Sequence, residues 1–562
     1  MKRPTVKLLY ALVASAMALA VPLAYAGNIT KAGTGTDLTA GASWTGGTAP
    51  GGLDVATWSS SSLGAGLTLG SAKTWGGISI TAALTDIAVT GAGPLTLTNG
   101  IDMSVSANNL TWSTPIVLGA NQAWSVNSGK ANTVGALISG PFGITKNGFG
   151  TLILSVSNSF SGGMTINAGT NIMGNAYALG TNTITLNGGV LKNNGAYNIT
   201  NSIVVGSSGG MITLNSANNI SYYGNVSGAG NLILGSSWGG GASSILMYGT
   251  NLMTSGTITM NPNAAVSRLK TPDASSAVLD WVMNGGSTEV SGTFNFGSFS
   301  GTGNFNAFNN NSGTTIYNIG GNNHDATYSA VLSANGTGQQ LSIVKLGTGA
   351  QTFSGNNSYT GTTTLEDGSL IASNNVNSGA ASPFGNSTSA IILGGDLTVS
   401  TNIAMHPQLL ISGPFTMARP VTVGNNNGAL GNAATTFTLG GNSSSNAIFS
   451  GSSITLNQNL IVTQATGGSL TISAPISDGG NNRSLTKIGG GTVTLSGANS
   501  YAGGTIVNQG VLLIGNTTQG NGVVTVADGA GVGVTATSDS TYWSPSSLVV
   551  GTSAGGTLQF SL

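Results

Sequence analysis

The sequence KNGFGTLILSVSNSFSGGMTINAG, which begins at Lys146, recurs as KLGTGAQTFSGNNSYTGTTTLEDG from Lys345 and as KIGGGTVTLSGANSYAGGTIVNQG from Lys487. The three copies are equal in length and share an opening lysine, glycines at offsets 2, 4, 16 and 23, Ser at offset 9, Asn-Ser at offsets 12 and 13, and Phe or Tyr at offset 14. Glycine could recur by composition in a chain with 90 Gly, but lysine could not, because only ten are present. A fixed internal spacing indicates a stacked array of similar units.

Alternation of polar and apolar residues within each copy predicts short β-strands. In the third copy, Thr492–Ser496 alternates, so that Val493 and Leu495 point to one face of a strand. Further short strands are expected at 505–507 and 511–514, separated by Gly and Asn residues that suit tight corners.

The first two copies differ in how they fill the predicted interior. In the first copy Leu152, Leu154 and Ile166 are expected to point inward. In the second copy Gln351 replaces the first inward apolar residue, which predicts that Phe353 alone fills that layer.

Two architectures could join these strands, a hairpin meander or a coil of parallel β-helix. The connections carry aromatic residues and several glycines, and the same residue types return in each copy, which favours the β-helix over two-residue hairpins. Stacked coils would place equivalent residues about 4.8 Å apart, so that asparagines can form amide ladders. At the corners, Phe160, Tyr359 and Tyr501 are interpreted as packing residues rather than ligand contacts.

Composition agrees with an all-β array. Glycine costs about 1 kcal/mol at each helix-interior position, so a chain this rich in it is not expected to be helical. At roughly 20 to 25 residues per coil, the chain after residue 26 would make about 21 to 27 coils. The length of the chain therefore sets no domain count, because a solenoid grows by adding coils.

The amino terminus predicts an export signal. Lys2, Arg3 and Lys7 precede an apolar stretch, 8–23, and Ala24-Tyr25-Ala26 after it has the small-x-small pattern of a cleavage site. We expect cleavage after Ala26, which leaves Gly27 first; an uncleaved membrane anchor is the alternative. No later segment is long and apolar enough to predict a membrane span.

Charge and cysteine content exclude some partners. Removing the three basic residues of the signal from 14 Lys and Arg leaves 11, against 14 Asp and Glu, so the mature chain is slightly acidic and is not expected to bind nucleic acid. The chain has no cysteine, although export would permit disulfides. One hypothesis is that a chain crossing a second, narrow pore unfolded cannot carry cross-links; chance absence is the alternative.

The K-x-G-x-G-T-L-x-L-S-x-x-N-S-Y-x-G-G pattern resembles the autotransporter-associated β-strand repeat, also called the passenger-associated transport repeat. Trp44-Thr-Gly-Gly-Thr-Ala-Pro50, Asp54-Val-Ala-Thr-Trp58 and Asn121-Gln-Ala-Trp124 are similar to amino-terminal stretches of such proteins, and Val226–Leu234 suggests a degenerate coil. The resemblance implies a right-handed parallel β-helix, a secreted or surface-displayed passenger of a Gram-negative bacterium, and repeats that help it through the outer membrane.

The resemblance also sets expectations for the organisation of the chain. We predict a signal at 1–26, an amino-terminal Trp-containing β region or cap at 27–140, and a β-helix at 141–562 whose clear repeats lie at 146–169, 345–368 and 487–510. No carboxyl-terminal barrel pattern is present, and the last residues, 555–562, read as the middle of a coil. We therefore expect either a fragment or a protein anchored in another way.

Catalysis would require clustered reactive side chains, and candidates are few. A polysaccharide-cleaving β-helix needs carboxylates clustered on one face, but the chain has only two Glu, Glu289 and Glu366, and its twelve Asp are scattered. His324-Asp325 is an adjacent acid and imidazole in a polar turn, where a solvated loop is the expected explanation. The G-x-S-x-G pattern of serine hydrolases occurs at three serines, as composition alone would yield: Ser208, Ser237 and Ser553.

Two further groups of residues suggest binding. The phenylalanines of residues 294–308 could form an aromatic surface, although core packing is favoured: Phe294, Phe296, Phe299, Phe305 and Phe308. The motif lysines could form an anionic binding row, but the long stretches of chain between the copies put many coils between them, so each is expected to serve its own corner. Two isolated His and no Cys predict no zinc site, and we expect no cofactor, no metal and no catalytic residue.

Three functions remain as hypotheses. The first is a non-catalytic passenger, secreted or held at the cell surface or outer membrane, that acts by adhesion or as a scaffold. Its partners would be the outer-membrane translocation machinery or a barrel domain on another segment, and host or cell-surface glycans or proteins. The second is a structural envelope or matrix protein that self-assembles. A β-helix polysaccharide lyase or hydrolase is the third and least favoured.

Overall fold

The structure, a computed structural model, describes residues 27–561 apart from 215–218, 236–243, 262–265, 309–312, 336–337, 426–428, 516–519, 521, 536–543 and 552. The signal predicted at residues 1–26 and the serine at 237 lie outside the described residues. The described elements are almost all strands, from β1 (Asn28–Thr30) to β53 (Thr557–Ser561). The described exceptions are one α-helix, α1 (Asp396–Ser400), and 3-10 turns at Gly41–Ser43 and Pro272–Ala274.

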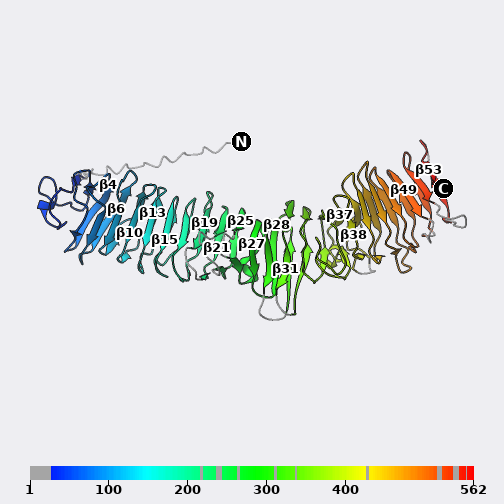
Figure 1. Cartoon of the computed structure of the whole chain (residues 1–562), viewed down its shortest axis with the longest axis horizontal. Coiled ribbons are helices and arrows are strands. Elements are labelled where there is room, and N and C mark those ends of the chain that lie inside the picture. Colours follow the sequence, from blue (N-terminus) through cyan, green and yellow to red (C-terminus); the bar gives the residue numbers. More distant parts are fainter. Residues whose placement is uncertain are drawn as a thin grey trace, which may run out of the picture.

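The strands form a parallel β-helix of about 21 turns, as predicted. Every pairing between named strands of the described residues is parallel. Figure 1 shows an elongated rod, with the first strands at one end and the last strands at the other. An all-parallel arrangement is the one that stacks each coil on the next along a single axis.

Each regular coil has three sides. One coil runs through β8 (Ile116–Leu118), β9 (Gln122–Val126) and β10 (Ala131–Val134). The next coil runs through β11 (Ile138–Ser139), β12 (Ile144–Asn147) and β13 (Thr151–Leu154), each paired in register with the strand before it. Inward residues of successive coils therefore form continuous columns, and alternate residues face outward.

The strands predicted in the repeats are present. In the third copy they are β47 (Thr492–Leu495), β48 (Thr505–Val507) and β49 (Val511–Gly515), and Val493 and Leu495 are buried as expected. In the first copy the residues predicted to point inward, on β13 and β14 (Met164–Ile166), are fully buried.

The second copy differs from the prediction in one layer. Its first strand, β33 (Ala350–Phe353), buries both Phe353 and Gln351, so Phe353 does not fill the layer alone. The Nε2 atom of Gln351 donates to the carbonyl oxygen of Phe299 at 2.9 Å and to that of Thr352 at 3.3 Å. A buried amide is tolerated because its donors are satisfied by backbone oxygens.

Tryptophans fill the core near the amino-terminal end. Trp44 lies 5.7 Å from both Trp58 and Trp75, and Trp75 lies 6.1 Å from Trp112, all with edge-to-face geometry. These rings are at most 2% exposed. They extend across β2 (Val55–Trp58), β4 (Lys73–Ile80) and β7 (Leu110–Ser113). A boundary between this region and the rest of the helix at residue 140 stays a prediction.

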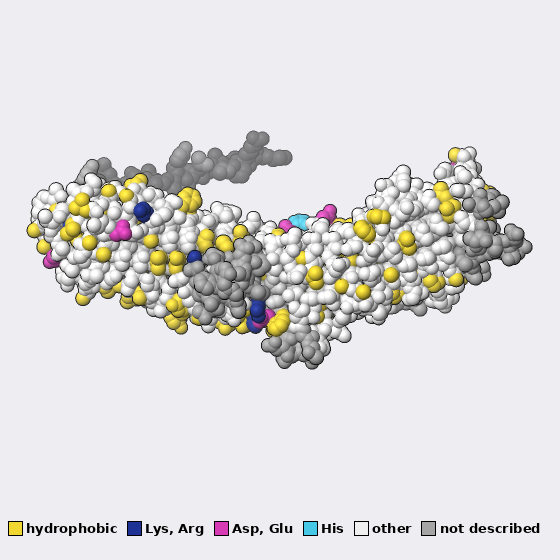
Figure 2. Space-filling view, in the orientation of Figure 1, with side chains coloured by type: hydrophobic (Ala, Val, Ile, Leu, Met, Phe, Trp, Pro, Cys, Tyr) yellow, Lys and Arg dark blue, Asp and Glu magenta, His cyan; other side chains and the backbone are white. Residues whose placement is uncertain are grey.

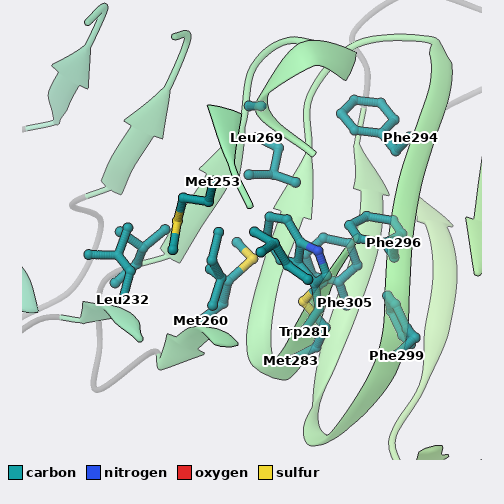
Figure 3. Close-up of a cluster of buried hydrophobic side chains, with 14 of the residues drawn as sticks. Leu232, Met253, Met260, Leu269, Trp281, Met283, Phe294, Phe296, Phe299 and Phe305 are labelled. Carbon is teal, nitrogen blue, oxygen red and sulfur yellow. The ribbon is translucent and has the colours of Figure 1, made fainter. Parts of the chain in front are cut away.

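A second aromatic cluster fills the middle of the rod. It lies on β27 (Ser276–Thr288), β28 (Gly292–Phe308) and β29 (Gly313–Ile319). Figure 3 shows Phe294, Phe296, Phe299 and Phe305 turned into the core beside Trp281. The core packing predicted for these four phenylalanines is present. Phe308, at the end of β28, is instead 37% exposed.

One coil is much longer than the others. Ser369 of β35 (Ser369–Ala372) pairs with Gln408 of β37 (Gln408–Ile411), whereas Thr151 already pairs with Thr170. The chain between Ser369 and its stacked partner is thus much longer than in a regular coil, and the extra residues include α1. The rod bends near this part of the chain (Figure 1).

Membrane-spanning helices were predicted to be absent after the signal. Within the residues that the structure describes, no helix has the length and apolar character to cross a membrane.

Candidate functional site

The three motif lysines are fully buried, and each Nζ donates to three backbone carbonyls. The acceptors are the residues at offsets 1, 2 and 22 of the motif. In the first copy, Nζ lies 2.8, 2.7 and 3.2 Å from the carbonyl oxygens of Asn147, Gly148 and Ala168. In the second copy, the distances to Leu346, Gly347 and Asp367 are 2.6, 2.8 and 3.1 Å. In the third copy, those to Ile488, Gly489 and Gln509 are 2.9, 2.6 and 3.0 Å.

The third acceptor belongs to the following coil. Lys146 on β12 pairs with Ile166 on β14, and Ala168 lies just beyond Ile166 at the corner of that next coil. Each lysine therefore ties its own corner to the corner stacked on it, as the prediction that each serves its own corner requires. We call this arrangement the lysine junction: Nζ of the motif lysine and its three carbonyl acceptors.

Glycine at the last motif position lets the junction close. Gly169 follows Ala168 and has φ of +64°, a left-handed conformation that favours glycine. A Cβ atom there would lie 2.3 Å from the carbonyl oxygen of Gly150 in the preceding coil. The equivalent Gly368 and Gly510 have φ of +66° and +63°. The recurring glycine thus follows from a close approach of two backbones.

Burial lowers the pKa of Lys146, Lys345 and Lys487 to about 8. At neutral pH the amines are still ammonium groups, held by three acceptors each. An unfolded lysine keeps its proton up to about pH 10.4. Between about pH 8 and that value the unfolded chain binds protons that the folded chain has lost, so the free energy of unfolding rises with pH in this window. Below about pH 8 the full cost of burying the charge is present.

We expect the free energy of unfolding of the mature chain, measured by urea titration, to rise between about pH 7.5 and about pH 9.5, by on the order of 1 kcal/mol for each lysine junction. Lys487→Met should reduce the rise. The window ends near pH 10, because burial raises the pKa of Tyr359 to about 12, so at higher pH the unfolded chain loses phenolic protons that the folded chain keeps. A free energy of unfolding that falls or stays constant over this pH window would contradict the prediction.

The motif asparagine at offset 12 connects three successive coils. In the first copy, Asn158 Oδ1 accepts from the N–H of Ile138 at 2.7 Å, and its Nδ2 donates to the carbonyl of Ala178 at 2.7 Å. In the second copy, Asn357 makes the same bonds with Leu332 and Pro383, at 2.7 and 2.6 Å. In the third, Asn499 accepts from Ile476 at 2.9 Å. All three asparagines are at most 4% exposed.

This asparagine replaces backbone pairing on one side of the coil. Ile138 lies on β11, but the segment stacked on it in the first copy contains no strand. The backbone N–H of Ser159 donates to the carbonyl of Ile138 at 2.9 Å, and the backbone N–H of Ile138 donates to the side-chain oxygen of Asn158. The Asn-Ser pair therefore supplies the acceptor and the donor that a parallel strand would supply. The second and third copies repeat the pattern with Ser358 and Ser500.

Amide ladders, expected for stacked corners, also occur outside the motif core. Asn167 donates to Asn147 at 2.9 Å, and Asn187 donates to Asn167 at 3.3 Å. These bonds link three neighbouring coils along the rod and leave the outer flank polar.

The aromatic residue at offset 14 packs inside the corner, as predicted. Phe160 and Tyr359 are fully buried and Tyr501 is 2% exposed. The two hydroxyls contact a threonine at offset 18, Tyr359 with Thr363 at 2.9 Å and Tyr501 with Thr505 at 2.7 Å. In the first copy, Phe160 has no hydroxyl and offset 18 is methionine. The two positions therefore form a matched pair within each repeat.

Tyr501→Phe is expected to lower the free energy of unfolding by about 1 kcal/mol, because it leaves the buried Thr505 hydroxyl without this partner. Tyr501→Phe combined with Thr505→Val should recover most of the loss, since both polar groups are then gone. Denaturant unfolding of the two variants and the parent chain checks this. A double variant no more stable than Tyr501→Phe would contradict it.

Two buried cations outside the three repeats were not anticipated. Lys31 is fully buried, and its Nζ donates to the carbonyls of Ala32 and Thr34 at 2.8 Å each. The sequence does mark Lys31, because residues 31–35 have the K-x-G-x-G pattern that opens each motif copy. Arg419, 1% exposed, donates to the carbonyls of Ser389 and Phe384. No sequence pattern marks this arginine.

The acidic residues considered for catalysis contact other parts of the chain. Glu289 bonds to Arg268 and Lys270, whereas Glu366 is buried and accepts from the backbone N–H and hydroxyl of Thr398, both at 2.8 Å. His324 contacts Asp280, at 2.9 Å from Nδ1 to Oδ1, rather than the adjacent Asp325. Asp325 instead accepts from the N–H of Ala350 at 2.7 Å, because its turn carries it toward the next coil.

The two described serines of the hydrolase pattern lie on the surface. Ser208 is exposed, and the Ser553 hydroxyl donates to Asp528 at 2.6 Å. The imidazole nitrogens of the described histidines contact Asp280, Asn322 and Thr436 rather than either serine. Among the residues that the structure describes, no three His, Cys, Asp or Glu side chains are grouped to hold a metal.

The fold and its repeated junctions define a class of protein, a parallel β-helix that carries transport repeats. The passenger-associated transport repeat family matches residues 144–170, 343–372 and 485–514. Over 416 residues, 65% of this chain, the sequence is 27% identical to the adhesin BmaC autotransporter of Brucella suis biovar 1 (strain 1330). The chain covers 11% of the length of that adhesin. No solved structure matches. The chain thus carries three passenger-associated transport repeats and is similar to part of an autotransporter adhesin.

Proposed function

We propose that this chain is a non-catalytic passenger segment, exported by a Gram-negative bacterium and displayed at its surface or secreted, where it acts by adhesion or as a scaffold. Cleavage near Ala26 and Gly27 would release the signal. The observation that carries the proposal is the lysine junction, built three times with the same acceptors at the same offsets. The similarity to an adhesin supports the adhesive role.

The junction suggests how the repeats assist secretion. Its third carbonyl comes from a neighbouring coil, so the lysine is fully satisfied only when two coils have stacked. A chain held extended in a narrow pore cannot form the junction, whereas a chain that has left the pore can. Folding outside the membrane, stabilised at each repeat, would oppose return of the chain. The partner in this step would be the translocation machinery or a barrel domain on another segment.

The surface suits contact rather than catalysis. Figure 2 shows a face dominated by uncharged polar side chains and backbone, with few basic or acidic groups. Only 5% of residues are charged. A flank of Ser, Thr and Asn offers hydrogen-bonding groups along the rod.

The test is a comparison of three activities of purified residues 27–562. Adhesion predicts saturable binding of the labelled chain to host or bacterial cells, measured by flow cytometry. Self-assembly predicts growth of light scattering with concentration and no cell binding, which would favour the structural envelope protein. Cleavage of acidic polysaccharides, measured by loss of viscosity, would instead support the lyase or hydrolase and overturn the proposal.

A further inference from the structure

A stacked pair of tyrosines, with Tyr223 exposed and Tyr248 half-buried, lies near the middle of the rod. Tyr223 follows β20 (Ile220–Tyr222) and Tyr248 follows β23 (Ser244–Met247), two strands that pair in register. Their ring centroids are 4.7 Å apart and the rings are inclined by 19°. Tyr223 is 48% exposed. Most aromatic side chains here fill the core, so this pair presents ring surface to solvent that the fold does not require.

Basic groups extend the tyrosine pair along the rod. Lys270 Nζ lies 5.7 Å from the ring centroid of Tyr248. Glu289, at the equivalent corner of the following coil, bonds to both Lys270 and Arg268. Two cations around one carboxylate leave a net charge of +1. Figure 2 shows such a group of basic and acidic side chains at the lower edge of the rod, on a surface otherwise poor in charge.

An open cavity of about 150 Å³ adjoins this group. It is lined by Arg268, Gly286, Ser287, Asn306 and Phe308. Arg268 lines this cavity with a side chain that is 30% exposed, and its buried Nε bonds to no described residue. Phe308 adds an exposed aromatic face at the cavity. Tyr223, Tyr248, Lys270, Glu289, Arg268 and Phe308 thus form a continuous surface, the tyrosine–arginine patch.

We propose that the tyrosine–arginine patch binds a saccharide that carries a carboxylate. The rings supply flat apolar faces for the C–H face of a sugar, and tyrosine also offers a hydroxyl at the edge. The guanidinium presents planar donors that match a carboxylate, and the residual positive charge favours an anion. Ser287 and Asn306 place polar groups at the cavity for sugar hydroxyls. Paired ring faces favour a saccharide over an acidic peptide, which the test includes as an alternative.

The site deepens the proposed adhesive function and rests on it, because it names the class of ligand for that surface. Three probes are titrated calorimetrically into residues 27–562: a hyaluronan tetrasaccharide, trigalacturonate and 3′-sialyllactose, each beside its carboxyl-reduced form. We expect at least one carboxylated probe to bind about tenfold more tightly than its reduced form. Binding should weaken when NaCl is raised from about 0.05 to about 0.5 M, because the charges are partly exposed.

Substitutions then locate the binding. Arg268→Gln and Tyr248→Ala should each lower the affinity about tenfold, and Tyr223→Ala provides a second variant of the ring pair. Lys192→Gln and Tyr177→Ala are the matched controls, since Lys192 is half-buried on another coil and Tyr177 is 65% exposed. Circular dichroism and thermal unfolding establish that each variant is folded. The control variants should bind as the parent chain does.

Several results would overturn the site. These are no binding of any probe up to about 10 mM, equal binding of the reduced forms, or equal losses in the control variants. Tighter binding of a polyglutamate peptide than of every sugar probe would assign the patch to acidic peptides instead. If Arg268→Gln and Tyr248→Ala bind cells as well as the parent chain does, the adhesive function is supported but the tyrosine–arginine patch is not its site. If the sugars bind but no cells do, the proposed function fails and the site stands.

Discussion

Lys487→Met is expected to lower the free energy of unfolding of the coils that this lysine joins by about 3 kcal/mol. Methionine has nearly the length of lysine but no donor, so the carbonyls of Ile488, Gly489 and Gln509 lose a common partner. Hydrogen bonds from a charged group contribute about 1.5 to 3 kcal/mol each, and relief from burying the charge offsets part of the sum. Lys146→Met and Lys345→Met should behave alike, because their acceptors are equivalent.

The measurement must be local, because a solenoid can open over a few coils while the rest stays folded. Hydrogen exchange of the backbone amides of β46 (Leu485–Ile488), β47 and β48 reports the affected coils. Lys192→Met is the control, since Lys192 is only half-buried on β17 (Val190–Asn193). We expect it to change stability by less than about 0.5 kcal/mol. Equal protection in the two variants would show that the lysine junction contributes nothing.

The strands and their inward faces were predictable because each depends on residues close together in sequence. Alternation alone placed Val493 and Leu495 inside. The parallel stacking of successive coils was then predicted from the recurrence of the repeat. The aromatic corners were predictable for the same reason, since the ring and, in the second and third copies, the threonine that it contacts lie within one short segment of the motif.

The lysine junction was not predictable in detail, because it depends on the length of a coil. The first copy of the motif begins at Lys146 and ends at Gly169, but Lys146 is already stacked against Ile166 of the same copy. The motif is therefore longer than one coil, and its last residues lie above its first. The sequence showed the recurring lysine but not this overlap, so the contact with Ala168 could not be anticipated.

The tyrosine–arginine patch could not be predicted from the sequence either. Tyr223, Tyr248 and Lys270 are far apart in sequence and lie in coils without the clear motif, so no repeat aligns them. Phe308 ends a run of phenylalanines whose earlier members are buried, and its exposure follows from its place at the end of β28. Surface groups that come together only by stacking carry no local pattern.

Asn357→Leu is expected to lower the free energy of unfolding of the coils around it by about 3 kcal/mol. Leucine is similar in size, but it leaves the N–H of Leu332 and the carbonyl of Pro383 without the partners they have at 2.7 and 2.6 Å. Each unsatisfied buried group costs about 1 to 3 kcal/mol. No strand pairing can replace these bonds, because the Asn-Ser segment stands where a strand would lie. Asn158→Leu should have a similar effect in the first copy.

The adjacent residue provides the control. Asn356 is exposed, so Asn356→Leu makes the same chemical change one position away without removing a bond between coils. We expect it to alter stability by less than about 0.5 kcal/mol. Hydrogen exchange should show faster opening at Leu332 in Asn357→Leu and no change in Asn356→Leu. Asn357→Asp separates the two bonds, because a carboxylate can still accept from Leu332 but cannot donate to Pro383. If Asn357→Asp loses less stability than Asn357→Leu but more than Asn356→Leu, both hydrogen bonds contribute. If Asn357→Leu is as stable as the parent chain, neither bond contributes.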